Sequence, residues 1–213
     1  MVMGRMLDHV SQTLNLALPE VYQNTQDAGG LSFLFTVPPA IGIGQGAMAG
    51  GPQQALAYVA ARHVAYYRPG HYMRQLVPTG TGLRAWLMAA IRMVAPKFAV
   101  PVNMDAQVKE HVAAIRQHLL GQQIDTLRSL TQKLLEAAPE LDMKGWMAGV
   151  DLTADRAGLI LCNDLKVANA VVDASPEEAA SVSRKDRLRE LLVYSTSENY
   201  FELRKRMGIS LGS

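Results

Sequence analysis

The sequence lacks several features that define whole classes of proteins. Its single cysteine, Cys162, excludes a framework of intrachain disulfides. Its N-terminus has no secretory leader, so we expect a reducing, cytoplasmic location. Its net charge of +2 is too balanced for a dedicated nucleic-acid-binding protein, so no nucleic-acid partner is expected.

The chain also lacks a long apolar run. The most apolar stretch is "LRAWLMAAIRMVAP", residues 83–96, which Arg84 and Arg92 interrupt and Pro96 ends. It falls well short of the roughly 20 apolar residues that a membrane-spanning helix needs. We therefore expect no membrane span, and interpret this stretch as a buried or amphipathic core helix.

What is present is an ordinary globular composition, with 49% hydrophobic and 19% charged residues in 213. The periodicity of the hydrophobic residues predicts an α+β protein that is mainly helical, with a small, short-stranded sheet near its N-terminus.

The helix boundaries are expected at several points. The long helical segment 144–174 is expected to be interrupted around Gly149. Another helix is expected to begin at "SPEE", with Ser175 as its N-cap and Glu178 closing a capping box. The basic residues Arg184, Lys185, Arg187 and Arg189 are interpreted as solvated helix faces.

Two stretches carry the candidate chemistry. The first, "YVAARHVAYYRPGHY", has the spacing of polar and apolar residues that is typical of a zinc-peptidase helix, in which His-Glu-x-x-His places two ligands on one face. The two histidines and the glutamate of that motif are absent at these positions. The second, "GVDLTADRAGLILCND", places Asp151 and Asp155 four residues apart, on one helix face. The candidate site residues are Arg62, His63, Tyr66, Arg68, His71, Asp151 and Asp155.

These stretches resemble the HtpX-type zinc metallopeptidases, a gluzincin family. "AIGIGQG" resembles their apolar strand, and "LAYVAARHVAY" resembles their Leu-x-x-Val-x-Ala-His-Glu-x-x-His helix. "DLTADRAGLIL" resembles their later Glu-x-x-Ala-Asp-Arg motif. The resemblance covers about residues 19–170 and implies a zincin-like core. From the order of the motifs we expect the helix of residues 53–68 to pack beside the helix that carries Asp151 and Asp155. It suggests a peptidase-like core over 1–174, with a C-terminal helical extension over 175–213 packed on the same domain.

The departures from the family pattern fall on the functional positions. Arg62 and Tyr66 occupy the positions at which the resemblance places the two zinc-binding histidines. His63 occupies the position of the catalytic Glu. Asp151, one methylene shorter, stands at the third ligand. Because arginine stays protonated, it repels a metal ion instead of binding it. We therefore expect no zinc, no cofactor and no metal-dependent catalysis.

Three interpretations of the altered site remain open. In the first, Arg62 compensates Asp151 or Asp155 and forms a salt-bridged structural plug. In the second, Arg62, His63 and Arg68 bind an anionic or peptide ligand. In the third, His63 and His71 form a new metal site with one of the aspartates.

At the level of function, the first hypothesis is a non-catalytic, peptidase-like domain of a bacterial-type system. It would serve as a protein-interaction or scaffold module, with a protein or peptide partner. The alternative is a hydrolase with an unorthodox metal site or a metal-free site in the same cleft.

Overall fold

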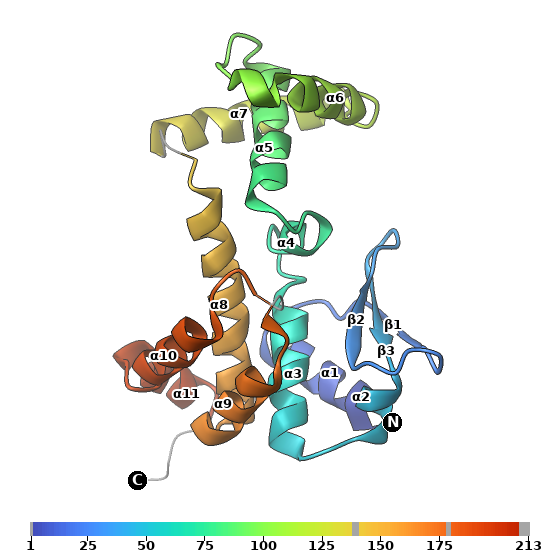
Figure 1. Ribbon diagram of the computed structural model, residues 1–213, viewed down its shortest axis with the longest axis vertical. Coiled ribbons are helices and arrows are strands. Elements are labelled where there is room, and N and C mark those ends of the chain that lie inside the picture. Colours follow the sequence, from blue (N-terminus) through green and yellow to red (C-terminus); the bar gives the residue numbers. More distant parts are fainter. Residues whose placement is uncertain (1, 138–140, 178–179, 209–213) are drawn as a thin grey trace. The chain divides into compact units, whose positions relative to one another are not determined.

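The computed structural model describes residues 2–137, 141–177 and 180–208 of the chain (Figure 1). It is mainly helical, with one small three-stranded sheet near the N-terminus, which confirms the predicted α+β class. Among the described residues, no helix is both long and apolar enough to cross a membrane. The apolar stretch 83–96 lies largely in one 15-residue helix, α5 (Gly80–Val94).

The chain divides into two compact units. Unit 1 combines the residues up to Leu76 with those from Met147 onward, and unit 2 is Val77–Trp146. Residue 174 and the described residues on both sides of it lie in unit 1. The prediction of a peptidase-like core with an extension stays a prediction.

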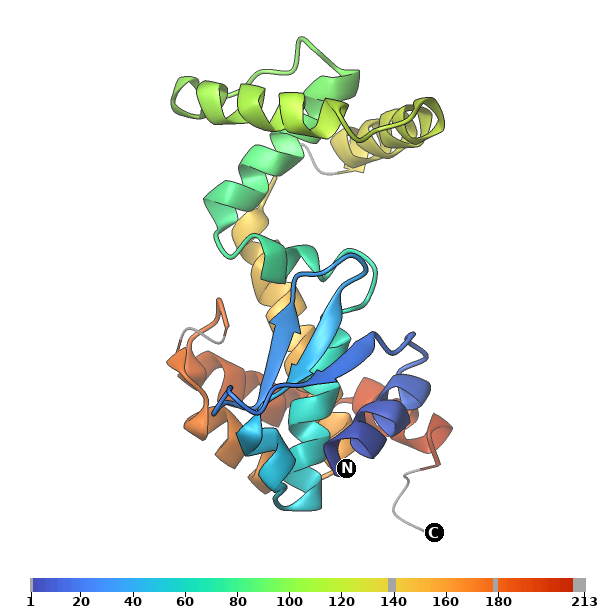
Figure 2. The same ribbon diagram turned by 90° about the vertical axis from the view of Figure 1, so that its right-hand side faces the viewer.

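Unit 1 contains the sheet and most of the helices (Figures 1 and 2). Its elements are α1 (Val2–Thr13), β1 (Glu20–Gln23), β2 (Leu31–Leu34), β3 (Ala40–Ile43), α2 (Gln45–Ala49), α3 (Gln53–Ala65), α4 (Met73–Leu76), α8 (Met143–Cys162, beginning at the end of unit 2), α9 (Leu165–Ala174), α10 (Arg184–Ser195) and α11 (Glu198–Arg206).

Strand β3 is the centre of the sheet, between β1, to which it is parallel, and β2, to which it is antiparallel. All four of its residues are buried, as expected for the central strand. Directly after it, the backbone at Gly44 passes so close to Gly29 that a Cβ would lie 2.6 Å from the Gly29 carbonyl oxygen. The glycine therefore permits the tight turn that leads from the sheet toward α2 and α3.

The first hydrophobic core lies where α1 and α3 meet the sheet. Buried side chains of Leu7 and Val10 from α1, Ile41 and Ile43 from β3, and Val64 from α3 form it. Since α3 also carries "YVAARHVA", this packing fixes the helix on which the first candidate motif lies.

A second core joins α3 to α8, as the order of the two motifs predicted. The ring of Tyr58 on α3 lies directly against Gly158 on α8, where a Cβ would come within 2.7 Å of it. Leu159 of α8 is fully buried in the same cluster. The prediction that the two motif-bearing helices pack side by side is therefore confirmed.

Two predicted helix boundaries are wrong. Helix α8 runs unbroken through Gly149, and the break comes instead at Asn163, which has a positive φ of 54°. There the Asp164 side chain caps α9 by accepting hydrogen bonds from two backbone N–H groups. Ser175 is the C-cap of α9, and the next long helix, α10, begins at Arg184 with Ser183 as its N-cap. Glu178 lies outside the described residues.

Unit 2 is helical. It contains α5, the 3-10 turn η1 (Val102–Met104), α6 (Asp105–Arg116) and α7 (Gly121–Ala137). Ala85, Met88 and Ala89 of α5 pack against Val108 of α6 in a small buried cluster. The candidate site residues all belong to unit 1.

A buried arginine–aspartate cluster as the candidate functional site

The candidate site is built from one face of α3 and one face of α8. Tyr58, Arg62 and Tyr66 recur at spacing four on or just after α3, so their side chains lie above one another. Asp151 and Asp155, also four apart, lie on the facing side of α8 and are both fully buried.

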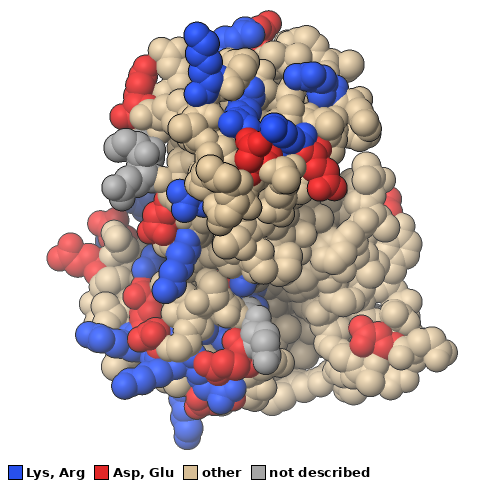
Figure 3. Space-filling model, turned by 45° about the horizontal axis from the view of Figure 1, so that its top comes forward, with Lys and Arg blue, Asp and Glu red and all other residues tan. Residues whose placement is uncertain are grey.

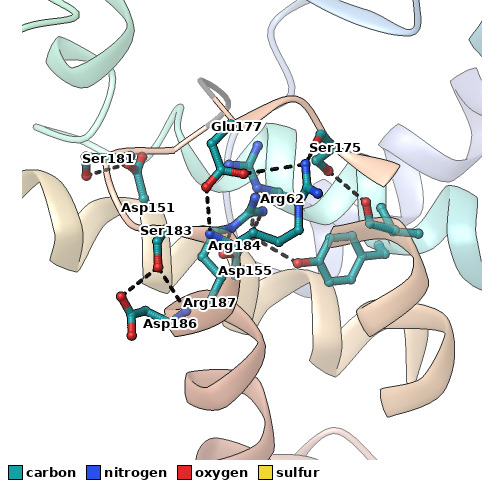
Figure 4. Close-up of polar contacts among 12 residues, drawn as sticks. Arg62, Asp151, Asp155, Ser175, Glu177, Ser181, Ser183, Arg184, Asp186 and Arg187 are labelled. Atoms are coloured by element: carbon teal, nitrogen blue, oxygen red, sulfur yellow. Dashed lines mark hydrogen bonds and ion pairs between the residues drawn. The ribbon is translucent and has the colours of Figure 1, made fainter. Parts of the chain in front are cut away.

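Asp155 is the centre of the cluster (Figure 4). Its Oδ1 accepts hydrogen bonds from Arg62 Nε at 2.8 Å and from Tyr58 Oη at 3.0 Å. Arg187, from α10, binds it with two nitrogens, Nε at 2.7 Å from Oδ2 and Nη2 at 2.8 Å from Oδ1. The predicted ion pair between Arg62 and one of the two aspartates is confirmed.

Asp151 has a different set of partners. Tyr66 Oη donates to its Oδ1 at 2.8 Å, and Arg74 Nη2, from α4, lies 3.3 Å from Oδ2. The backbone N–H and the hydroxyl of Ser181 both donate to Oδ2, at 2.5 and 2.7 Å. Because Arg62 Nη2 donates to Tyr66 Oη at 3.1 Å, the partners of the two aspartates form one continuous network.

Charge balance explains why two carboxylates can be buried here. They face three guanidinium groups, those of Arg62, Arg74 and Arg187. Burial alone would raise the pKa of Asp155, but hydrogen bonding from Arg187 and the charge of Arg62 outweigh it and hold that pKa below its ordinary value. Asp155 is therefore ionised at neutral pH.

The two tyrosines act as neutral donors. Burial, with the nearby Asp155 charge, raises the pKa of Tyr58 far above the usual value for a phenol. Burial likewise raises the pKa of Tyr66. Both phenols therefore keep their protons at neutral pH and donate hydrogen bonds to the carboxylates.

These residues do not fit a zinc ion at the positions that the resemblance implies. The guanidinium of Arg62, at the first ligand position, is already bound to Asp155. Both oxygens of Asp151, at the third position, accept hydrogen bonds from this chain's own residues. A cation at this point would have to displace these donors and face three positive charges.

In comparisons with known protein families, with curated proteins and with solved structures, nothing matches this chain. The similarity to the HtpX-type peptidases therefore remains a resemblance of short motifs in a fixed order. What the cluster does has to be argued from its own geometry.

Three of the predicted site residues lie outside the cluster. The ring of His63 stacks on Phe33 at a centroid distance of 4.0 Å, and its buried Nε2 has no hydrogen-bond partner in the described structure. Burial, with the charge of Arg62, lowers the pKa of His63 to about 3, so the imidazole is neutral. His71 and Arg68 follow the end of α3, and Arg68 is exposed.

The interpretation of a new metal site finds no support in this arrangement. Within the described ranges, no three His, Cys, Asp or Glu side chains converge in a way that could hold a metal ion. The expectation that the protein uses no cofactor stays a prediction.

Four members of the cluster were not predicted. Tyr58 could have been, because it precedes Arg62 by four residues on the same helix face. Arg187 was interpreted as part of a solvated basic face, which is wrong, since it is only 2% exposed. Arg74 and Ser181 lie in a short helix and a loop, where spacing gives no signal.

A neighbouring ion pair positions Arg187. Arg156, which follows Asp155 on α8, pairs with Glu190 on α10, and its guanidinium lies 5.0 Å from the centroid of the Tyr194 ring. Glu190 is three residues after Arg187, on an adjacent part of the same helix face. The pair therefore fixes α10 where Arg187 can reach Asp155.

Proposed function

We propose that this chain is a non-catalytic, zincin-like domain resembling the HtpX-type peptidases, and that it serves as a protein-interaction or scaffold module. An arginine–aspartate cluster takes the structural place of the zinc ion. The observation that carries the proposal is the 2.8 Å contact between Arg62, at the first ligand position, and Asp155.

The arrangement of the carboxylates argues against hydrolysis at this point. A general base must reach a water molecule or the substrate with a free acceptor atom. Asp151 and Asp155 are fully buried, and the cluster's own donors bind all four of their oxygens. His63, at the position of the catalytic Glu, is stacked on Phe33 instead.

The same contacts suit a structural role. Hydrogen bonds within the buried cluster link α3, α8 and the segment from Ser181 to Arg187. In a metallopeptidase, a bound metal ion would make such a link. Such a domain keeps its shape without a metal and leaves its surface available to a protein or peptide partner. A cytoplasmic location and the absence of nucleic-acid binding belong to the same proposal.

Metal analysis and a cleavage assay test the proposal together. The purified full chain is incubated with zinc, dialysed and analysed for metal, and casein cleavage is measured with and without a chelator. We expect far less than one zinc per chain and no chelator-sensitive cleavage. The variant Arg62→His/His63→Glu/Tyr66→His, which introduces the family's His-Glu-x-x-His motif at these positions, is the matched control for zinc binding.

Stoichiometric zinc in the parent chain, or cleavage that a chelator abolishes, would refute the proposal. Either result would favour the alternative, a hydrolase with an unorthodox metal site. Chelator-insensitive cleavage that Asp151→Asn abolishes would equally refute it and would indicate a metal-free hydrolase.

A further inference from the structure

We draw no further inference here: the strongest candidate, the exposed face of α10 on which Lys185 and Arg189 lie beside Leu192 and Val193, supports no proposal, because Asp186 is exposed on the same helix, acidic and basic side chains are mixed on the surface of the molecule (Figure 3), and nothing in the structure shows what covers the two aliphatic side chains.

Discussion

Replacing Arg187 by alanine should clearly destabilise unit 1. The side chain is 2% exposed and binds the fully buried Asp155 through two nitrogens, at 2.7 and 2.8 Å. Removing one partner of a buried ion pair typically costs about 3–5 kcal/mol, because the other charge is left without compensation. Asp155 would keep Arg62 and Tyr58, so we expect a loss near the lower end, about 3 kcal/mol.

The distribution of aromatic residues supplies the assay. All seven tyrosines lie in unit 1, whereas both tryptophans, Trp86 and Trp146, lie in unit 2. Tyrosine second-derivative absorbance during urea or thermal unfolding therefore reports on unit 1, and tryptophan fluorescence reports on unit 2. A loss of about 3 kcal/mol corresponds to a fall of roughly 6–12 °C in the tyrosine-detected Tm for a chain of this size.

Two further variants serve as controls for Arg187→Ala. Arg187→Lys keeps the charge but loses the two-point contact, so its loss should be intermediate. Arg206→Ala breaks a pair with Glu202 in which both side chains are largely exposed, and it should have almost no effect. If Arg187→Ala unfolds like the parent, or no more easily than Arg206→Ala, the buried cluster does not stabilise the fold and the reasoning fails.

Two other predictions follow from the same helices. Because the pKa of Asp155 is lower in the folded chain than the ordinary value of 3.8, its ionised form stabilises the fold above about pH 4, and this stability is lost as the pH falls through the folded pKa. The difference in unfolding free energy between the parent and Asp155→Asn should therefore shrink below pH 4, and a constant difference would contradict the ionised pair. Gly158→Ala should cost about 1–3 kcal/mol, since its Cβ would lie 2.7 Å from the Tyr58 ring, whereas Gly149→Ala on the same helix meets nothing within 4 Å and should be neutral or stabilising. Urea unfolding of both variants checks this, and equal effects would show that α3 and α8 do not pack as described.

The sequence predicted those parts of the structure that depend on local periodicity. Spacings of four residues placed Arg62 with Tyr66, and Asp151 with Asp155, on single helix faces. The packing of the two helices and the Arg62–Asp155 pair were predicted from the resemblance and from the charges at its altered positions. The helix break predicted at Gly149 lies instead at Asn163, which has a positive φ, and the side chain of Asp164 caps the helix that follows.

The rest of the site depends on contacts between distant segments. Arg187 looks like any residue of a solvated basic helix, and only the tertiary position of α10 buries it. Ser181 reaches Asp151 from a loop that no periodicity describes. His63 is adjacent to Arg62 in sequence, yet one position along a helix turns a side chain by about 100°, which carries its ring toward Phe33 and away from the cluster.

A double-mutant cycle between Arg62 and Asp155 tests the central claim most directly. Unfolding free energies of the parent, Arg62→Met, Asp155→Asn and the double variant are measured by tyrosine absorbance in urea. The account predicts that Arg62→Met is clearly destabilising and that the two residues are coupled by at least about 1 kcal/mol. A coupling energy near zero, with Arg62→Met unfolding like the parent, would show that Arg62 does not compensate the buried carboxylate.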